Sequence, residues 1–312
     1  MERRNSQRMC LFNRQGALSP KVEALLLQGK TTSALRKIKL YATKIMSKIK
    51  KIIKTGIAAS LCGAGLFVLA RRYGITSKIA EFAQNIEAVP FPGTELYSFL
   101  LARQLRPLYA EIASEIHEEG RFARILDLDT GPGYLPIELA LRNHFHTIVG
   151  MDRSIDMVRV AKANARASNV EKVIEFTQGE PTNIPFPGRY FDLVVSVNVL
   201  HHWRNSSQVF DEIYRILNPG GEFWLYDYQS EVPLEEWQKY EKELPIHLRL
   251  AFEVGPMASW RAAYSKKELL EIAEATHFAD AEVEPRTFTL FGKPMSVFFR
   301  LRLRKPDQTR IE

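Results

Sequence analysis

The stretch RILDLDTGPGYLPIELA, Arg124 to Ala140, decides the fold of this chain. It joins a short apolar run to a helical pattern through a loop that holds Asp129, Gly131 and Gly133. Glycine after a strand allows backbone conformations that are closed to other residues and lets a ligand approach the main chain. The stretch therefore predicts a strand, a turn and a helix, and the turn is either a ligand-binding loop or an ordinary connection.

The alternation of short apolar runs and helical patterns continues beyond this stretch. Apolar runs predict strands at 123–129, 147–152, 173–179, 191–200 and 222–228, and helical patterns follow from about residue 135, at 154–167 and at 207–221. A further helix is predicted at 266–276, followed by two antiparallel strands near 281–290 and 295–304. Strands that alternate with helices indicate a mostly parallel sheet with helices on both faces.

An acidic residue stands at the end of the second predicted strand. Asp152 follows Gly131 by about 20 residues, the spacing at which a carboxylate accepts hydrogen bonds from the hydroxyls of a ribose. The same residue could cap the next helix, although Ser154 is available for that role. Pro136 occupies the position where a nicotinamide-dinucleotide site has its third glycine, which disfavours a dehydrogenase. The pattern therefore indicates a site for an adenosine-type ligand.

Four motifs occur in the order and spacing of a known enzyme family. They are ILDLDTGPGYL, VGMDRSIDMVRVAKANA, QGEPTNIPFPGRYFDLVVSVNVLHHW and EIYRILNPGGEFWLYD. From about Phe91 to Arg304 the chain resembles the class I S-adenosylmethionine-dependent methyltransferases, especially those that modify quinones, sterols and other small molecules. The resemblance implies S-adenosyl-L-methionine as cofactor and an α/β fold, with a Rossmann-like seven-stranded mostly parallel sheet and helices on both faces.

The resemblance also implies roles for the residues at matching positions. The methionine end of the cofactor would be lined by Asp127, Gly131 and Gly133, with Asp129 among them. Asp152 would bind the ribose, with Arg153 and Met157 near the adenosine. Glu180 would lie near the adenine amino group. The pocket under the sulfonium would be closed by Asn198 and Val199.

Two positions depart from the family pattern. Asp129 stands where the family usually has glycine, and Glu180-Pro181 replaces an aspartate followed by a small residue. Aspartate tolerates the left-handed backbone better than most residues, so the loop can survive the first change. These departures keep open the alternative of a cofactor-binding protein of the same fold without methyltransferase activity.

A histidine pair follows the fourth predicted strand, close to where the transferred methyl group should lie. Methyl transfer is an in-line displacement, and histidine has a pKa suited to removing a proton from the acceptor near neutral pH. His202, and next to it His201, are therefore the candidate catalytic bases. In the alternative interpretation the enzyme only positions the acceptor and one histidine packs in the loop.

A segment rich in aromatic residues connects the fifth predicted strand to Ser265. An insertion at this place commonly covers the acceptor site in this fold, and its aromatic side chains would suit an apolar acceptor. Core packing is the alternative role for most of them. No cluster of cysteine and histidine has the spacing of metal ligands, so no metal is expected. With only Cys10 and Cys62, the chain has no disulfide framework either.

The charge of the chain is unevenly divided. Residues 1–80 carry 17 Lys and Arg and two acidic residues, whereas residues 81–312 carry 26 Lys and Arg and 34 acidic residues. Such an asymmetry indicates two regions with different partners. The predicted organisation is a basic, partly apolar helical extension at 1–80, the methyltransferase domain at 81–305 and a tail at 306–312.

Two segments of the extension suggest how it acts. Residues 34–54 repeat apolar positions at spacings of three and four among basic residues, which predicts a basic amphipathic helix. Residues 55–70 are uncharged but shorter than the about 20 residues of a straight membrane span. We expect residues 34–72 to bind a membrane surface, peripherally or as a short anchor, with the catalytic domain on the cytoplasmic side.

The basic extension has two alternative partners besides a membrane. It could pack on its own catalytic domain, or it could serve as the arm of an RNA methyltransferase. The acidic balance of residues 81–312 makes that domain a poor surface for a polyanion, so nucleic acid is an unlikely partner.

Overall fold

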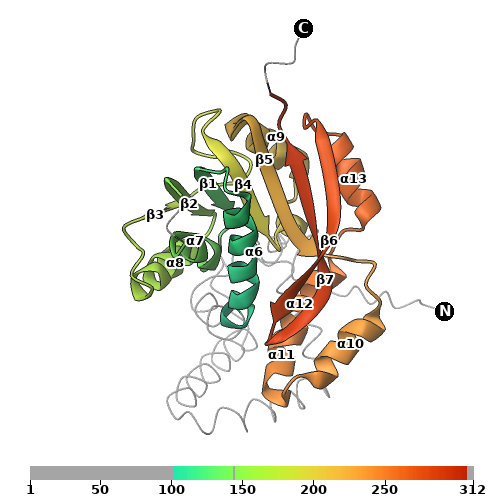
Figure 1. The fold of residues 1–312 in the computed structure, drawn as a ribbon. Helices are drawn as coiled ribbons and strands as arrows, with labels where there is room; N and C mark the ends of the chain where they lie inside the picture. The colour runs from blue at the N-terminus through green and yellow to red at the C-terminus, as the bar shows by residue number, and fades with distance from the viewer. Residues whose placement is uncertain (1–101, 143–144, 308–312) are drawn as a thin grey trace, which may run out of the picture. The chain divides into compact units, whose positions relative to one another are not determined.

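The computed structural model describes residues 102–142 and 145–307 of the chain (Figure 1). The predicted extension at 1–80, including the expected helix at 34–54 and the apolar segment at 55–70, lies outside the described residues. Most of the predicted tail at 306–312 also lies outside them. The predicted domain boundaries therefore stay predictions.

A seven-stranded sheet forms the centre of the described domain, in the order β3-β2-β1-β4-β5-β7-β6. Its strands are β1 (Arg124–Leu128), β2 (Thr147–Asp152), β3 (Ile174–Gln178), β4 (Phe191–Val197), β5 (Leu217–Tyr228), β6 (Asp280–Leu290) and β7 (Lys293–Arg304). The first five strands pair in parallel, and β7 runs antiparallel to both β5 and β6. This sheet confirms the predicted fold class, including the terminal antiparallel hairpin.

Helices lie on both faces of this sheet (Figure 1). They are η1 (Ala102–Leu105), α6 (Arg106–Glu119), α7 (Tyr134–Ala140), α8 (Ile155–Ala167), η2 (Leu200–His202), α9 (Ser206–Ile216), α10 (Leu234–Glu243), α11 (Ile246–Val254), α12 (Pro256–Arg261) and α13 (Lys266–Glu274). Neighbouring residues of a strand point to opposite faces, so Ile125 packs in the cluster under α6, α7 and α8 while Leu126 packs in the cluster under α9 and α13. The parallel strands are buried on both faces for this reason.

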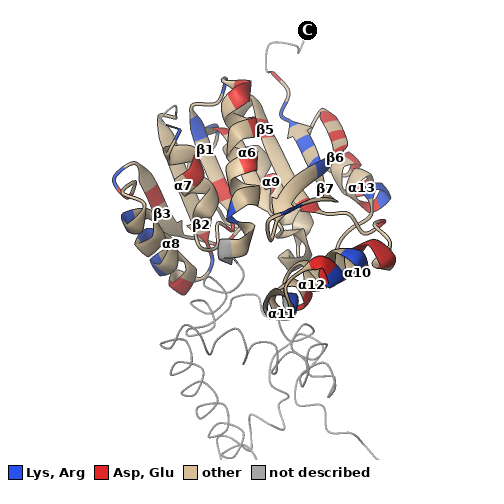
Figure 2. Cartoon of the chain, turned by 60° about the horizontal axis from the view of Figure 1, so that its bottom comes forward, with Lys and Arg blue, Asp and Glu red and all other residues tan. Residues whose placement is uncertain are grey.

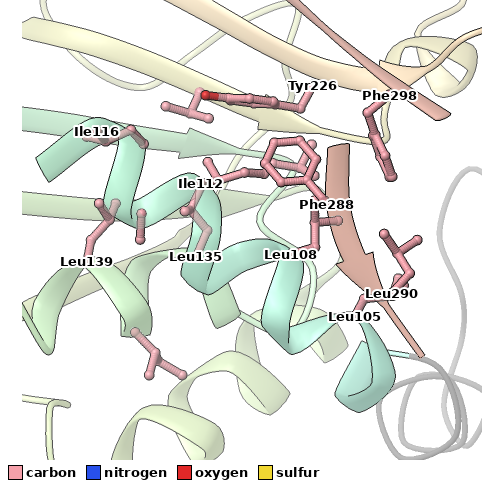
Figure 3. Close-up of a cluster of buried hydrophobic side chains, with 14 of the residues drawn as sticks. Leu105, Leu108, Ile112, Ile116, Leu135, Leu139, Tyr226, Phe288, Leu290 and Phe298 are labelled. Atoms are coloured by element: carbon pink, nitrogen blue, oxygen red, sulfur yellow. The ribbon is translucent and has the colours of Figure 1, made fainter. Parts of the chain in front are cut away.

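Helix α6 covers the front of the sheet and was not among the elements predicted from the sequence. Its apolar residues Leu108, Ile112 and Ile116 recur every four positions and are buried (Figure 3). They belong to one apolar cluster with Tyr226 of β5 and Phe288 of β6. The sequence thus contains the spacing of a buried helix face. Through this face α6 packs on the terminal hairpin.

Two of the predicted boundaries were wrong by three residues or more. Strand β4 ends at Val197 instead of residue 200, because Asn198 adopts a left-handed conformation with φ 58° and the chain leaves the sheet there. Strand β5 begins at Leu217 instead of residue 222, so the helix that was predicted to end at the Pro-Gly-Gly turn of residues 219–221 already ends at Ile216. Pro219 explains the second correction, since proline disfavours the helical conformation in the residue before it.

Candidate functional site

The loop after β1 has the left-handed geometry that its glycines predicted. Asp129, Gly131 and Gly133 have φ values of 59°, 53° and 78°. Gly133 also begins α7, and a Cβ atom there would lie 2.7 Å from the Cβ of Ala161. No atom lies within 4 Å of the corresponding position at Gly131. The loop therefore packs tightly on α8 at Gly133 and leaves space in front of Gly131.

Asp152, at the end of β2, holds this loop in place. One carboxylate oxygen accepts a hydrogen bond from the backbone N–H of Gly131 at 2.8 Å, and the other accepts one from Ser154 at 2.8 Å. Ser154 caps α8 by accepting a hydrogen bond from the N–H of Met157. Asp152 is therefore not the helix cap, and each of its oxygens keeps acceptor capacity for a further donor.

The acidic side chains of this region raise one another's pKa. Asp127 is fully enclosed, and burial, opposed by a hydrogen bond from Thr130 Oγ1, raises the pKa of Asp127 to about 8. Burial and the neighbouring charge of Asp129 raise the pKa of Asp152 to about 6. Such pKa shifts are common at functional sites, because these sites bring several buried groups of like charge close together.

Asp129 connects the loop after β1 to the loop after β4. Its Oδ2 accepts a hydrogen bond from Trp203 Nε1 at 2.7 Å, and its Oδ1 lies 3.8 Å from Arg153 Nε. Sequence reasoning missed Trp203, although the residue directly follows the histidine pair in the sequence. Its indole explains how a carboxylate is accommodated at a position that usually holds glycine.

The segment after β4 carries the other predicted site residues. The backbone N–H of Asn198 donates to the carbonyl of Tyr226 at 2.7 Å, and Asn198 Nδ2 donates to Ser259 Oγ of α12 at 3.3 Å. Asn198 therefore lies between the loop after β4 and the insertion that precedes β6. Val199 is buried in the apolar cluster on the α9 side, and its expected place under the sulfonium stays a prediction.

The rings of the two histidines of η2 lie against each other, with centroids 4.0 Å apart and planes tilted by 44°. Burial lowers the pKa of His201 to about 4, and burial together with His201 and Arg153 lowers the pKa of His202 to about 3. Both rings are thus uncharged at neutral pH. Their proton affinity is, however, far below the near-neutral value that sequence reasoning assumed.

A buried carboxyl that was not predicted supports this segment from below. Asp227, near the end of β5, accepts a hydrogen bond from the backbone N–H of Leu200 at 3.2 Å. Burial, opposed by hydrogen bonds from backbone N–H groups, raises the pKa of Asp227 to about 7. Its only signal in the sequence was an acid within the apolar strand EFWLYDY.

The remaining two predicted residues lie at the other side of the loop after β1. Met157 is buried on the first turn of α8. Glu180 is exposed after β3. Burial, opposed by Arg153 and by the hydrogen bond from Trp203, raises the pKa of Asp129, and the charge of Glu180 adds to this rise. Met157 and Glu180, together with Arg153, place the expected adenosine-binding residues along the carboxyl ends of β2 and β3.

The insertion between β5 and β6 folds into α10, α11, α12 and α13. The rings of Trp237 and Trp260 lie 5.4 Å apart, and Trp237 also packs against Phe252 at 5.8 Å. Trp237, Phe252 and Met257 are buried, so these side chains serve core packing. In the ranges 102–142 and 145–307, no group of side chains has the arrangement of a metal site, and no helix is long and apolar enough to cross a membrane.

The chain is similar to known methyltransferases in sequence. Residues 126–225 match a family model described as "Methyltransferase domain". A Bacillus subtilis protein named "Uncharacterized methyltransferase YcgJ" is 31% identical over 150 residues, which cover 47% of this chain and 56% of the relative. A demethylmenaquinone methyltransferase from Lactobacillus johnsonii is 32% identical over 135 residues, covering 42% of this chain and 54% of the relative. The chain thus spans about half the length of these relatives.

A solved structure has the same architecture over a larger part of the chain. It comes from Methanococcus maripaludis, is described as a candidate S-adenosyl-L-methionine-dependent methyltransferase, and superposes with a TM-score of 0.50 at 22% identity. The match covers 70% of this chain and 94% of that structure. At this identity the likeness concerns the fold.

Proposed function

We propose that this chain, a class I S-adenosylmethionine-dependent methyltransferase by its fold and its family match, transfers the methyl group of S-adenosyl-L-methionine to a small-molecule acceptor. One observation carries the proposal. A left-handed loop after β1, held by Asp152 of β2, faces a second loop after β4 that carries a pair of uncharged histidines. Ligands of open parallel sheets bind at these carboxyl ends.

The residues present fit this cofactor. The carboxylate of Asp152 retains lone pairs for the ribose hydroxyls, and the space in front of Gly131 allows a ligand to approach the backbone. The buried Oδ1 of Asp129 has no hydrogen-bond partner among the described residues, and the cofactor carries positive charge. Methionine-end contacts would come from the loop after β1, and adenosine contacts from the ends of β2 and β3.

S-adenosyl-L-methionine, when bound, supplies an electrophilic methyl group. The protein contributes mainly alignment of the acceptor for in-line attack. The imidazoles of His202 and His201 are uncharged, so they add no positive charge that would oppose a cationic cofactor. Their low pKa values make them weak bases, which favours positioning of the acceptor over removal of its proton. Asp227 positions this pair through the backbone of Leu200, which keeps the rings fixed relative to β4.

Cofactor binding tests the proposal directly. We expect Asp152→Ala to weaken binding of S-adenosyl-L-methionine to the full chain by about 2 kcal/mol, roughly thirtyfold, because hydrogen bonds to a charged group are lost. Isothermal titration calorimetry measures the affinity. Asp156→Ala is the matched control, since Asp156 pairs with Arg159 on α8 and should leave binding unchanged.

The outcomes separate the competing functions. Unchanged affinity in Asp152→Ala would remove Asp152 from the cofactor site, and no binding at millimolar cofactor would contradict the proposal. A chain that binds the cofactor but transfers no methyl group to any extracted metabolite would be the binding protein that the departures at Asp129 and Glu180 suggested.

We infer further that the acceptor is lipophilic and enters beneath the insertion. Asn198, at the end of β4, is hydrogen-bonded to Ser259 of α12, so the insertion touches the segment next to the histidines. Trp260 of α12 lies one residue after Ser259 and is not among the fully buried side chains, and one relative is named for demethylmenaquinone, a quinone. An RNA acceptor is less favoured, because charges of both signs are interspersed on α8, α10 and α13 (Figure 2).

A membrane surface is the proposed source of such an acceptor. The basic amphipathic pattern at 34–54 and the apolar segment at 55–70 support peripheral or short-anchored attachment, with the domain at the cytoplasmic face. We expect the full chain to sediment with anionic vesicles even in molar salt, because salt screens only the charge contribution. A chain beginning at Ile75 should stay in the supernatant and still bind the cofactor. Equal sedimentation of both chains would contradict the assignment, and retention on RNA columns only in the full chain would favour the nucleic-acid arm.

A further inference from the structure

Asp129 bridges the two loops between which the reacting sulfonium must lie. Its backbone belongs to the loop that would hold the methionine end of the cofactor, and its side chain is bonded to Trp203, next to the histidine pair. It keeps a left-handed φ of 59° although it carries a side chain, a conformation that costs a non-glycine residue about 1 kcal/mol. The observed hydrogen bond to the indole helps to offset this cost and fixes the carboxylate in the site.

The carboxylate of Asp129 is buried and incompletely paired. Its side chain is 11% exposed, its Oδ1 has no hydrogen-bond partner in the described part of the chain, and Arg153 Nε is 3.8 Å away. The charges of Glu180 and Asp152 belong to the same cluster, whereas the nearby Asp127 holds its proton and Arg153 is the cation that acts on Asp129. The balance of this cluster is therefore negative.

We propose that Asp129 makes the cofactor site select the positively charged sulfonium of S-adenosyl-L-methionine over the neutral thioether of S-adenosyl-L-homocysteine. This inference rests on the proposed function. The two molecules share the adenosine, the amino group and the carboxylate, and differ by the methyl group and the charge on sulfur. A carboxylate that spans the methionine loop and the histidine loop is placed to act on that difference.

The selection follows from Coulomb attraction in a poorly solvated site. The interaction of a buried carboxylate with a cation is several times stronger than in water, since little solvent screens it. A neutral thioether gains nothing from the same carboxylate and only pays for its desolvation. Transfer of the methyl group removes the positive charge, so the site loses affinity for the product as soon as it forms.

The chemistry of the cluster also explains why the position is not glycine. Glycine at residue 129 would fit the left-handed loop without strain, and it would leave Trp203 Nε1 without its acceptor. A strained aspartate that pairs partly with Arg153 is costly for the empty protein. Discrimination between S-adenosyl-L-methionine and S-adenosyl-L-homocysteine would compensate for this unfavourable energy.

Calorimetry on the full chain at pH 8 tests the inference with Asp129→Asn and Asp129→Gly. Asparagine keeps the shape and tolerates the left-handed backbone, and glycine relieves the strain, so at least one folded variant is expected. We expect the ratio of the dissociation constants, product over S-adenosyl-L-methionine, to fall about tenfold in both variants. The analogue in which a protonated amine replaces the sulfonium should weaken in parallel with S-adenosyl-L-methionine. Asp156→Asn is the control and should keep the wild-type ratio.

The outcomes distinguish failure of the charge selection by Asp129 from failure of cofactor binding by the chain. An unchanged ratio, with or without a common loss of affinity, would overturn the selection by charge and leave Asp129 a structural residue or a partner of the shared amino group. Failure of the wild-type chain to bind any of the three ligands would instead overturn the proposed function. A fall in the ratio in both variants would establish Asp129 as the residue that discriminates product from substrate.

Discussion

Replacing Gly133 with alanine should lower the free energy of unfolding of the full chain by about 3 kcal/mol. The added Cβ atom would lie 2.7 Å from Ala161 Cβ and 2.9 Å from two ring carbons of Phe176, distances that require both neighbours to move. Its φ of 78° adds strain for any residue with a side chain. Because α7, α8 and β3 all meet at this point, the shift cannot be confined to the loop.

Gly131 provides the matched control two residues earlier in the same loop. It has a comparable φ of 53°, but a Cβ atom there would have no neighbour within 4 Å. Gly131→Ala should therefore cost only the backbone strain, about 1 kcal/mol. Urea denaturation followed by circular dichroism measures both values, and equal losses in the two variants would contradict the tight packing of Gly133 against α8.

The stability of the cofactor-free chain should fall as pH rises from 5 to 8, in part because of Asp127. Burial raises its pKa from 3.8 to about 8, so the folded protein holds this proton more tightly than the unfolded chain. The linked stability is complete below the unfolded value and is lost as pH rises towards the folded value. In Asp127→Asn this loss disappears, and its unfolding free energy relative to the wild type should increase by up to about 1.4 kcal/mol per pH unit.

Glu212→Gln is the control for this pH dependence. Hydrogen bonds from Arg215 hold the pKa of Glu212 below its usual range, so this carboxylate is charged throughout the interval. Its replacement should shift stability by the same amount at every pH between 5 and 8. Denaturation midpoints measured in one buffer series compare the variants, and a constant offset for Asp127→Asn would show that Asp127 is ionised in the folded protein.

The alternation of apolar runs and helical patterns was enough to predict the sheet. Strand β2 begins and ends where the sequence predicted, because it is an uninterrupted apolar run that ends on Asp152. Helix α6 was not predicted, because its buried apolar residues alternate with charged ones. They are buried only through contacts with β5 and β6, which are distant in the sequence. The end of β4 was placed too late because the apolar run continues through Val199 and Leu200, although Asn198, of a residue type that tolerates the left-handed backbone, interrupts it.

The candidate site was predictable where a residue acts through its own position in the loop. Gly131, Gly133 and Asp152 fall in this class, and the structure brings them together through the hydrogen bond from Gly131 to Asp152. Contacts between distant segments were not predictable. The bond between Asp129 and Trp203 joins residues 74 positions apart, and the depressed pKa of the histidine pair results from burial, which a linear pattern does not report.

The antiparallel hairpin fixes both ends of the insertion and so makes it an exchangeable part. Residues 222–228 of β5 pair along their length with residues 298–304 of β7, and β6 pairs with the other edge of β7. The chain that leaves β5 for α10 and returns through β6 is thus anchored by backbone hydrogen bonds between strands, which do not involve the side chains of the insertion. The segment between β5 and β6 can accordingly change in sequence while the strands that carry the loops after β1, β2 and β4 keep their places in the sheet.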